Sequence, residues 1–195
     1  MWDKRYNTDE YVYGTEPNGF LKSAAAKIPA GKVLCLGEGE GRNAVYLAEL
    51  GHQVTAVDSS SVGLQKARKL AEDRGVSIET IAADIEQYSI EPEHWDAIVS
   101  IFFHLMPEPR RSLHQQVVGG LRPGGVFILE AYTVDQLNYK TGGPKTEELM
   151  MSLEALKAEL EGLDFAHGVE MERDLVEGKL HTGKGAVVQI LAFKP

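Results

Sequence analysis

The fold of this chain is decided by Leu36-Gly37-Glu38-Gly39-Glu40-Gly41-Arg42-Asn43. This stretch follows a compact apolar run, Lys32–Leu36, and leads into a segment with helical periodicity, Arg42–Leu50. Glycines let a backbone approach a ligand closely, and a following helix directs free N–H groups and its positive dipole end at the same point. We therefore expect a strand–turn–helix unit that binds a ligand, with a tight turn that binds nothing as the alternative.

Strands and helices continue to alternate after this unit. Further strands are expected at Gln53–Val57, Val76–Ala82, Ala97–Phe103 and Val126–Ala131, and helices after the N-caps Ser59–Ser61 and over Glu108–Gly119. The unbroken apolar character of Ala97–Phe103 is typical of a strand that is covered on both faces. Strict alternation predicts right-handed crossovers and a parallel, doubly wound sheet.

The last third of the chain has a different pattern. A helical stripe of leucines is followed by a run that alternates apolar and polar residues, Leu163–Met171, and by a final strand, Ala186–Phe193. The loop Glu177–Gly185 has no room for a crossover helix, so the last two strands should form an antiparallel hairpin. The expected fold class is α/β, a doubly wound Rossmann-like sheet of about seven strands with a C-terminal antiparallel hairpin.

Length and composition indicate a single globular domain of 195 residues, with residues 1–31 as an N-terminal lid extension and 32–195 as the ligand-binding domain. The chain has 20 basic and 29 acidic residues, and its net charge of −9 disfavours nucleic acid as a partner. It has no long uncharged apolar run, no secretory signal and one cysteine. We expect a cytoplasmic protein without a membrane partner, as a monomer or a weak dimer.

The spacing of the glycines bears on the identity of the ligand. A dinucleotide fingerprint, G-x-G-x-x-G, requires glycine where Arg42 stands, so the observed G-x-G-x-G favours S-adenosylmethionine over NAD. Asp58 ends the second strand, where an acid accepts hydrogen bonds from a ribose diol, although it could also cap the next helix. Asp84 ends the third strand and, with Ile85, suits an adenine amine and ring; a loop acid is the alternative. Because the carboxyl ends of parallel strands share one edge, these groups should line one crevice.

With these features, residues 32–195 resemble the class I S-adenosylmethionine-dependent methyltransferases. The resemblance rests on the glycine turn, the two strand-end acids, the terminal hairpin and Arg122-Pro123-Gly124-Gly125. A narrower similarity, to tellurite-resistance and thiopurine-type methyltransferases, rests on Gly41-Arg42-Asn43-Ala44, Tyr11-Val12-Tyr13-Gly14, Pro17-Asn18 and the end of the strand at 97–103. It implies that Arg42 helps to hold the methionine carboxylate and that the N-terminal aromatic segment folds over the cofactor.

One position departs from the family pattern. Members usually carry an acid two residues before the first glycine, whereas this chain has Cys35 there. Glu38 is a candidate replacement, although Glu38 and Glu40 could equally be solvated. We interpret Cys35 itself as a small buried apolar residue.

Two groups of site residues follow from this interpretation. The predicted cofactor-binding residues are Gly37, Glu38, Gly39, Gly41, Arg42, Asn43, Asp58, Ser59, Asp84, Ile85 and Ile101. The predicted lid and acceptor residues are Tyr6, Tyr11, Tyr13, Pro17, Asn18 and Tyr139. The loop Tyr139–Lys145 should form the wall opposite the lid; alternatively, the N-terminal aromatics, which include Phe20, only cover the outer face of the sheet.

His104 follows the fourth strand and is the candidate catalytic base, with a packed or solvent-facing side chain as the alternative. No His, Cys and Asp spacing suggests a metal site. The predicted function is S-adenosylmethionine-dependent methyl transfer to a small-molecule acceptor. A soft nucleophile, such as a thiol or a tellurium or selenium anion, is favoured because it needs no base. The alternatives are an NAD-dependent oxidoreductase, which Arg42 disfavours, and a non-catalytic S-adenosylmethionine-binding protein, which Cys35 leaves open.

Overall fold

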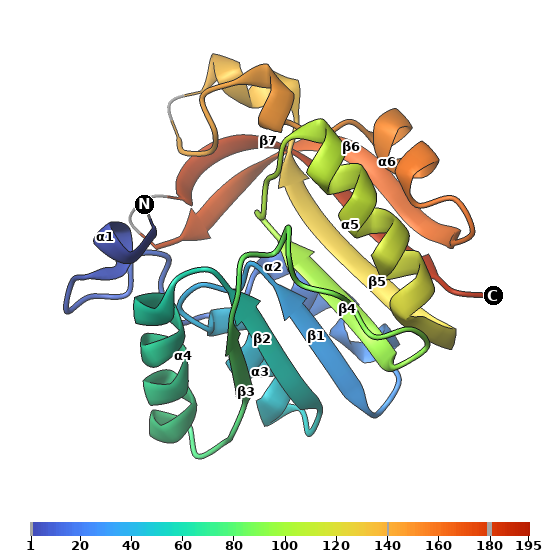
Figure 1. Cartoon of the computed structure of the whole chain (residues 1–195). Coiled ribbons are helices and arrows are strands. Elements are labelled where there is room, and N and C mark those ends of the chain that lie inside the picture. Colours follow the sequence, from blue (N-terminus) through green and yellow to red (C-terminus); the bar gives the residue numbers. More distant parts are fainter. Residues whose placement is uncertain (1, 140, 179–180) are drawn as a thin grey trace.

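A seven-stranded sheet runs through the computed structural model, which describes residues 2–139, 141–178 and 181–195 (Figure 1). The strand order is β3-β2-β1-β4-β5-β7-β6. The strands are β1 (Lys32–Leu36), β2 (Gln53–Asp58), β3 (Glu79–Ala82), β4 (Trp95–Ile101), β5 (Leu121–Tyr132), β6 (Asp164–Glu177) and β7 (His181–Phe193). β1 to β5 are parallel, and β7 pairs antiparallel with both β5 and β6. The predicted fold class is confirmed.

Helices cover both faces of the sheet (Figure 1). They are α1 (Trp2–Tyr6), α2 (Gly19–Ala24), α3 (Arg42–Glu49), α4 (Ser61–Asp73), α5 (Pro107–Gly120) and α6 (Leu153–Glu159), with the 3-10 turns η1 (Ala25–Lys27), η2 (Val134–Asn138) and η3 (Glu147–Leu149). None of the helices in the described ranges is both long and apolar enough to cross a membrane.

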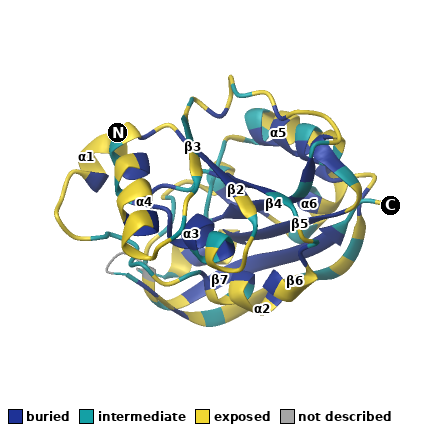
Figure 2. Cartoon of the chain, turned by 90° about the horizontal axis from the view of Figure 1, so that it is seen from below, coloured by how far each residue is buried: buried dark blue, intermediate teal, exposed yellow. Residues whose placement is uncertain are grey.

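Alternation along the strands divides the core into two layers. In β1, Leu34 and Leu36 belong to the cluster that contains residues of α5 and α6. Val33 and Cys35 belong to the opposite cluster, together with residues of α2 and α3. Successive strand side chains point to opposite faces, which gives each layer its own set of apolar residues. Figure 2 shows these buried positions concentrated in the strands.

Four expectations about local structure need correction. β3 begins at Glu79 rather than at Val76, and the helix expected from Leu149 to Leu160 is divided into η3 and α6. The turn expected at residues 122–125 lies within β5, where the pairing with β4 shifts register between Trp95 and Ala97. The loop expected over Glu177–Gly185 is wrong, because Glu177 pairs with His181 and Val176 with Thr182. Residues 179 and 180 of that segment lie outside the described residues.

The N-terminal extension crosses the edge of the sheet where the parallel strands end. Its helix α1 contacts α4, and Asp3 accepts a hydrogen bond of 2.6 Å from the Ser60 hydroxyl at the start of α4. Asn18 caps α2 by accepting a hydrogen bond from the amide of Leu21. The expected helix at Gly19–Lys27 is present as α2 and η1, whereas α1 was not predicted.

A buried ion cluster holds α5 against α6. Arg110 donates to Glu159 at 2.8 Å, and the Nδ1 atom of His114 lies 2.7 Å from the same carboxylate. Burial alone would raise the pKa of Glu159, but its hydrogen bonds to His114 and Arg110 lower that pKa to about 2. The carboxylate is therefore ionised at neutral pH and compensates the buried guanidinium.

Replacement of Glu159 tests this cluster. Glu159→Gln leaves Arg110 buried without its counter-ion, which should cost about 3 kcal/mol of stability. For a chain of this size the melting temperature should fall by roughly 6–12 °C. Glu161, which is exposed and lies two residues after Glu159, gives the matched control, Glu161→Gln. Equal melting temperatures for the two variants would contradict a stabilising role for the cluster.

Candidate active site

The glycine turn between β1 and α3 has a backbone conformation that glycine alone adopts easily. Gly37 and Gly39 have φ of 61°, and Gly41 has φ of 89°. A Cβ atom on Gly37 would lie 2.2 Å from the ring of Phe103, and one on Gly39 would lie 2.5 Å from the Tyr6 hydroxyl. Because these positions carry no Cβ atom, the ring of Phe103 can contact Gly37 and the Tyr6 hydroxyl can contact Gly39.

Asp58 ties this turn to α4. Its carboxylate accepts hydrogen bonds from the amides of Gly39 at 2.8 Å and Ser60 at 2.7 Å. Burial raises the pKa of Asp58, and the two backbone bonds act against that rise. The N-cap of α4 is Ser60 rather than Asp58, while Ser59 lies exposed at the same turn. Asp58 thus stands at the end of β2, as expected, with its carboxylate directed toward the glycine turn.

Glu38 caps the first turn of α3. Its Oε1 atom accepts hydrogen bonds from the amides of Asn43 at 3.0 Å and Ala44 at 2.8 Å. Burial raises the pKa of Glu38 to about 7, against the opposing effect of these bonds and of Arg42. Cys35 is fully buried beneath it in the core, and burial raises the pKa of its thiol. Glu38 is therefore a half-buried acid at the start of α3, and its hydrogen bonds distinguish it from a solvated loop residue.

Arg42 extends from α3 into a buried charged network. One terminal nitrogen donates to Glu177 at 2.5 Å, while Nη1 is buried with no hydrogen-bond partner among the described residues. The other members are Asn18, Glu130, Arg173, Glu177 and Gln189, joined by bonds of 2.5 to 3.0 Å. Asn43 joins the network by accepting from the amide of Asn18. Burial opposes ionisation of Glu177, but Arg42 and Arg173 lower its pKa.

Sequence reasoning missed Glu130, Arg173 and Glu177. A usable signal was present, because Glu130 is a charged residue inside an apolar strand and must find partners when it is buried. The identity of those partners depends on the pairing of β5, β7 and β6, which a residue pattern does not specify.

The two residues predicted to bind adenine differ in solvent exposure. Asp84 is exposed and accepts a hydrogen bond from the amide of Glu86, as a loop acid does. Ile85 is buried in the core cluster of the α5 and α6 face. Ile101 ends β4 and belongs to the opposite cluster. Of the strand-end residues, Asp58 has the direct contact with the glycine turn.

His104 is held by backbone groups at both ring nitrogens. Nδ1 lies 2.8 Å from the carbonyl oxygen of Leu149, and the amide of Tyr132 donates to Nε2 at 3.4 Å. The ring also stacks on that of Tyr132, with 5.8 Å between centroids. Burial lowers the pKa of His104 to about 4, so the ring is neutral at physiological pH. This geometry gives His104 the role of a structural link and no free nitrogen for proton transfer.

The predicted lid residues are buried or half-buried, and the neighbouring Phe20 packs in a different place. Tyr6 is buried on Gly39 and its ring packs edge-on against that of Tyr13. Tyr11 and Pro17 are half-buried, and Asn18 is fully buried. Phe20 instead packs on His167 at 5.4 Å, so it covers the sheet as the alternative interpretation proposed.

The predicted opposite wall is only partly near these aromatics. Tyr139 donates a hydrogen bond to Glu172 on β6. Lys140 lies outside the described residues, and a Cβ on Gly143 would lie 2.9 Å from the ring of Tyr132. The segment after Lys140 thus approaches Tyr132, while Tyr139 turns toward the outer strand.

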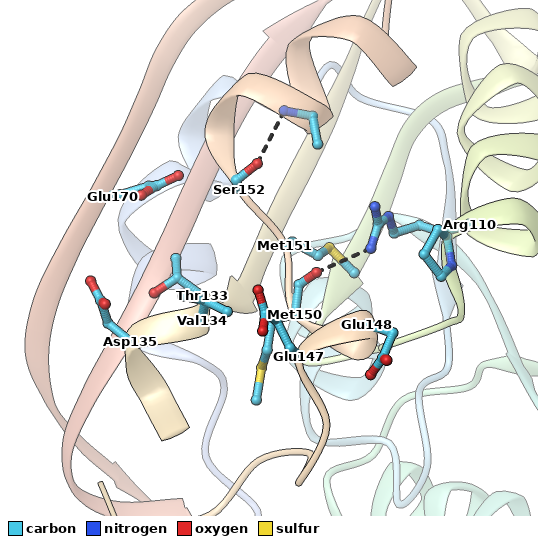
Figure 3. A pocket seen from close by; sticks show the side chains of 12 residues that line it. Arg110, Thr133, Val134, Asp135, Glu147, Glu148, Met150, Met151, Ser152 and Glu170 are labelled. Atoms are coloured by element: carbon cyan, nitrogen blue, oxygen red, sulfur yellow. Dashed lines mark hydrogen bonds between the residues drawn. The ribbon is translucent and has the colours of Figure 1, made fainter. Parts of the chain in front are cut away.

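A cavity of about 560 Å³ lies beyond the end of β5, between α5 and α6 (Figure 3). Carboxylates dominate its charged lining: Asp135, Glu147, Glu148 and Glu170. Arg110 also lines it but is already paired with Glu159. Residues of the glycine turn are not part of the lining. In the described ranges, no cluster of three or more His, Cys, Asp or Glu side chains is arranged to hold a metal ion.

Substitution of Cys35 tests whether the family's acid can be restored. Cys35→Asp places a carboxylate in the core beside Glu38, and we expect a loss of about 3–5 kcal/mol in stability. Cys35→Ala is the control, and it should cost about 1 kcal/mol. Chemical denaturation measures both. A stable Cys35→Asp protein that binds the cofactor more tightly would contradict the interpretation of Cys35 as a core residue.

Several methyltransferases are similar to this chain. Residues 33–125 match a family described as "Methyltransferase domain". The chain is 35% identical over 102 residues to 2-heptyl-1-hydroxyquinolin-4(1H)-one methyltransferase of Mycobacteroides abscessus, covering 51% of this chain and 45% of the relative. It is 36% identical over 114 residues to tRNA 5-carboxymethoxyuridine methyltransferase of Escherichia coli K12, covering 54% and 42%.

A third similarity is to TehB of Haemophilus influenzae. The chain is 33% identical over 132 residues to this probable S-adenosyl-L-methionine-dependent methyltransferase, covering 67% of this chain and 44% of TehB. The crystal structure of TehB superposes with a TM-score of 0.75 at 26% identity, over 100% of this chain and 66% of that one. The chain spans less than half the length of the three curated relatives.

The individual site residues remain predictions, whereas the predicted family and cofactor are confirmed. The seven-stranded sheet with its antiparallel C-terminal hairpin agrees with the structural similarity. The chain is related to TehB, and these similarities support a class I S-adenosylmethionine-dependent methyltransferase.

Proposed function

We propose that this chain transfers the methyl group of S-adenosylmethionine to a small molecule whose acceptor atom is a soft nucleophile, such as a thiolate or a tellurium or selenium anion. The observation that carries the proposal is His104: both of its nitrogens are engaged and its pKa is about 4. An acceptor that must lose a proton needs a base, and this histidine is not available as one. A soft anion needs none.

The cofactor, when bound, supplies an activated methyl group on a sulfonium. The protein's task is then alignment, which can contribute roughly 7–11 kcal/mol. Arg42 would bind the methionine carboxylate, because its buried Nη1 lacks a partner in the described part of the chain. Glu38 would bind the methionine ammonium, and Asp58 the ribose hydroxyls.

The acceptor would lie under the N-terminal segment, beside the rings of Tyr6, Tyr13 and Phe103. These rings lie over or next to the glycine turn. A lid of this kind excludes water while the methyl group is transferred. One relative acts on tRNA, but the net charge of −9 on this chain favours a small acceptor.

Cofactor binding should depend on pH through Glu38. Its pKa in the free protein is about 7, and only the ionised form attracts an ammonium group. Between pH 7 and pH 5.5 the dissociation constant of S-adenosylmethionine should therefore rise by about tenfold. Isothermal calorimetry should show weaker, pH-independent binding for Glu38→Gln, and wild-type behaviour for the exposed-site control Glu72→Gln. A Glu38→Gln protein that keeps the wild-type pH dependence would exclude Glu38 as the ammonium ligand.

Turnover separates the acceptor classes and tests the proposed absence of a base. We expect methylation of aryl thiols or of reduced tellurium or selenium anions, and none of unmodified tRNA. His104→Gln should keep kcat within about threefold, since loss of a true general base costs roughly 10²- to 10⁴-fold. Transfer to tRNA alone would refute the proposed acceptor. Binding of S-adenosylmethionine without transfer to any of these acceptors would favour a non-catalytic binding protein.

A further inference from the structure

Glu40, in the middle of the glycine turn, is almost completely buried although it is charged. Its Oε2 atom accepts hydrogen bonds from the amides of Val12 at 2.9 Å and Tyr13 at 3.2 Å. Its Oε1 atom accepts from the ammonium group of Lys66 at 2.5 Å. A buried carboxylate is costly unless it is paired and hydrogen-bonded, and here the partners come from the N-terminal segment and from α4.

Lys66, on α4, directs its ammonium group into the same segment. Besides Glu40, it donates to the carbonyl oxygens of Glu10 at 2.6 Å and Tyr6 at 3.3 Å. A lysine has three N–H donors, so all of them are used. The group also lies 5.0 Å from the centre of the Tyr11 ring, and the Tyr11 hydroxyl donates to the carbonyl of Lys66. The turn from Tyr6 to Tyr11 is thus folded around one cation.

The segment held in this way touches both sides of the candidate site. Tyr6 lies against Gly39 and Gly63, at the glycine turn and the start of α4. On the other side, a Cβ on Gly178 would lie 2.4 Å from the backbone of Tyr13. The chain at Tyr13 therefore passes between the glycine turn and the end of β6.

We propose that Glu40 and Lys66 are positioning residues that clamp residues 6–13 onto the glycine turn, and so couple cofactor binding to closure of the lid. The inference rests on the proposed function for the purpose of the lid, but the clamp itself is a property of the free protein. Glu40 belongs to the turn that contacts the cofactor in the proposed function. A change in that turn on cofactor binding therefore moves the Glu40 carboxylate, which accepts the hydrogen bonds of the Val12 and Tyr13 amides. If cofactor binding favours closure of the lid, closure of the lid must favour cofactor binding by the same factor.

Hydrogen–deuterium exchange on the full chain tests the clamp without any turnover. In Glu40→Gln and Lys66→Met, the amides of Val12 and Tyr13 should exchange about tenfold faster or more, while those of β1 and β4 stay protected. The double variant should be no faster than the single ones, because both changes remove the same unit. Lys69→Met, an exposed lysine on the same helix, and Glu72→Gln are the controls and should match the wild type. Unchanged exchange of Val12 and Tyr13 in both clamp variants would overturn the proposal.

Added S-adenosylmethionine tests the coupling. It should slow the exchange of Val12 and Tyr13 in the wild type and in the controls, and do so much less in the clamp variants, whose dissociation constants should rise by about tenfold. Protection of the glycine turn with no effect on Val12 and Tyr13 in the wild type would refute coupling. Failure of the proposed function gives a different result: the clamp variants still open the segment, but no acceptor is methylated by the wild type.

Discussion

The structure depends on how the glycine turn after β1 is held by carboxylates. The turn contains glycines in the left-handed conformation. Acidic side chains accept hydrogen bonds from the backbone amides of the turn and of the segments next to it. Glu38 takes the first free amides of α3, and Asp58 takes the amide of Gly39. Glu40 points into the N-terminal segment and accepts hydrogen bonds from two of its amides. Three acids in one small region are tolerated because each has a specific set of donors, and because Arg42 and Lys66 supply positive charge nearby.

The same turn explains how far the sequence could predict the molecule. The order of elements follows from apolar runs and glycine spacing, because burial and periodicity are local properties. Asp58 was predicted because it ends the second strand, and Arg42 because Gly41-Arg42-Asn43-Ala44 resembles a family motif; the roles of both stay predictions. Glu40 was not, since a buried and a solvated glutamate are identical in a sequence, and what differs is a pair of amides about 27 residues away.

Errors in the local predictions have a similar origin. Glycines at 178 and 183 suggested a loop, yet residues 181 to 185 pair with β6. His104 looked like a base because of its place after β4. The backbone groups that engage both of its nitrogens come from Tyr132 and Leu149, which reach it only after the chain has formed β5 and returned.

The buried network around Asn18 also has a consequence for the order in which the molecule is assembled. Asn18 donates to Glu130 and Glu177, which follow it by 112 and 159 residues. A ribosome makes the early segment first, at roughly 5–20 residues per second. Asn18 must therefore wait several seconds, at least, before its last partner exists. The side chain of Asn18 is therefore among the last groups of the N-terminal segment to be fixed, although the contacts of that segment with Glu40 and Lys66 involve residues that are made much earlier.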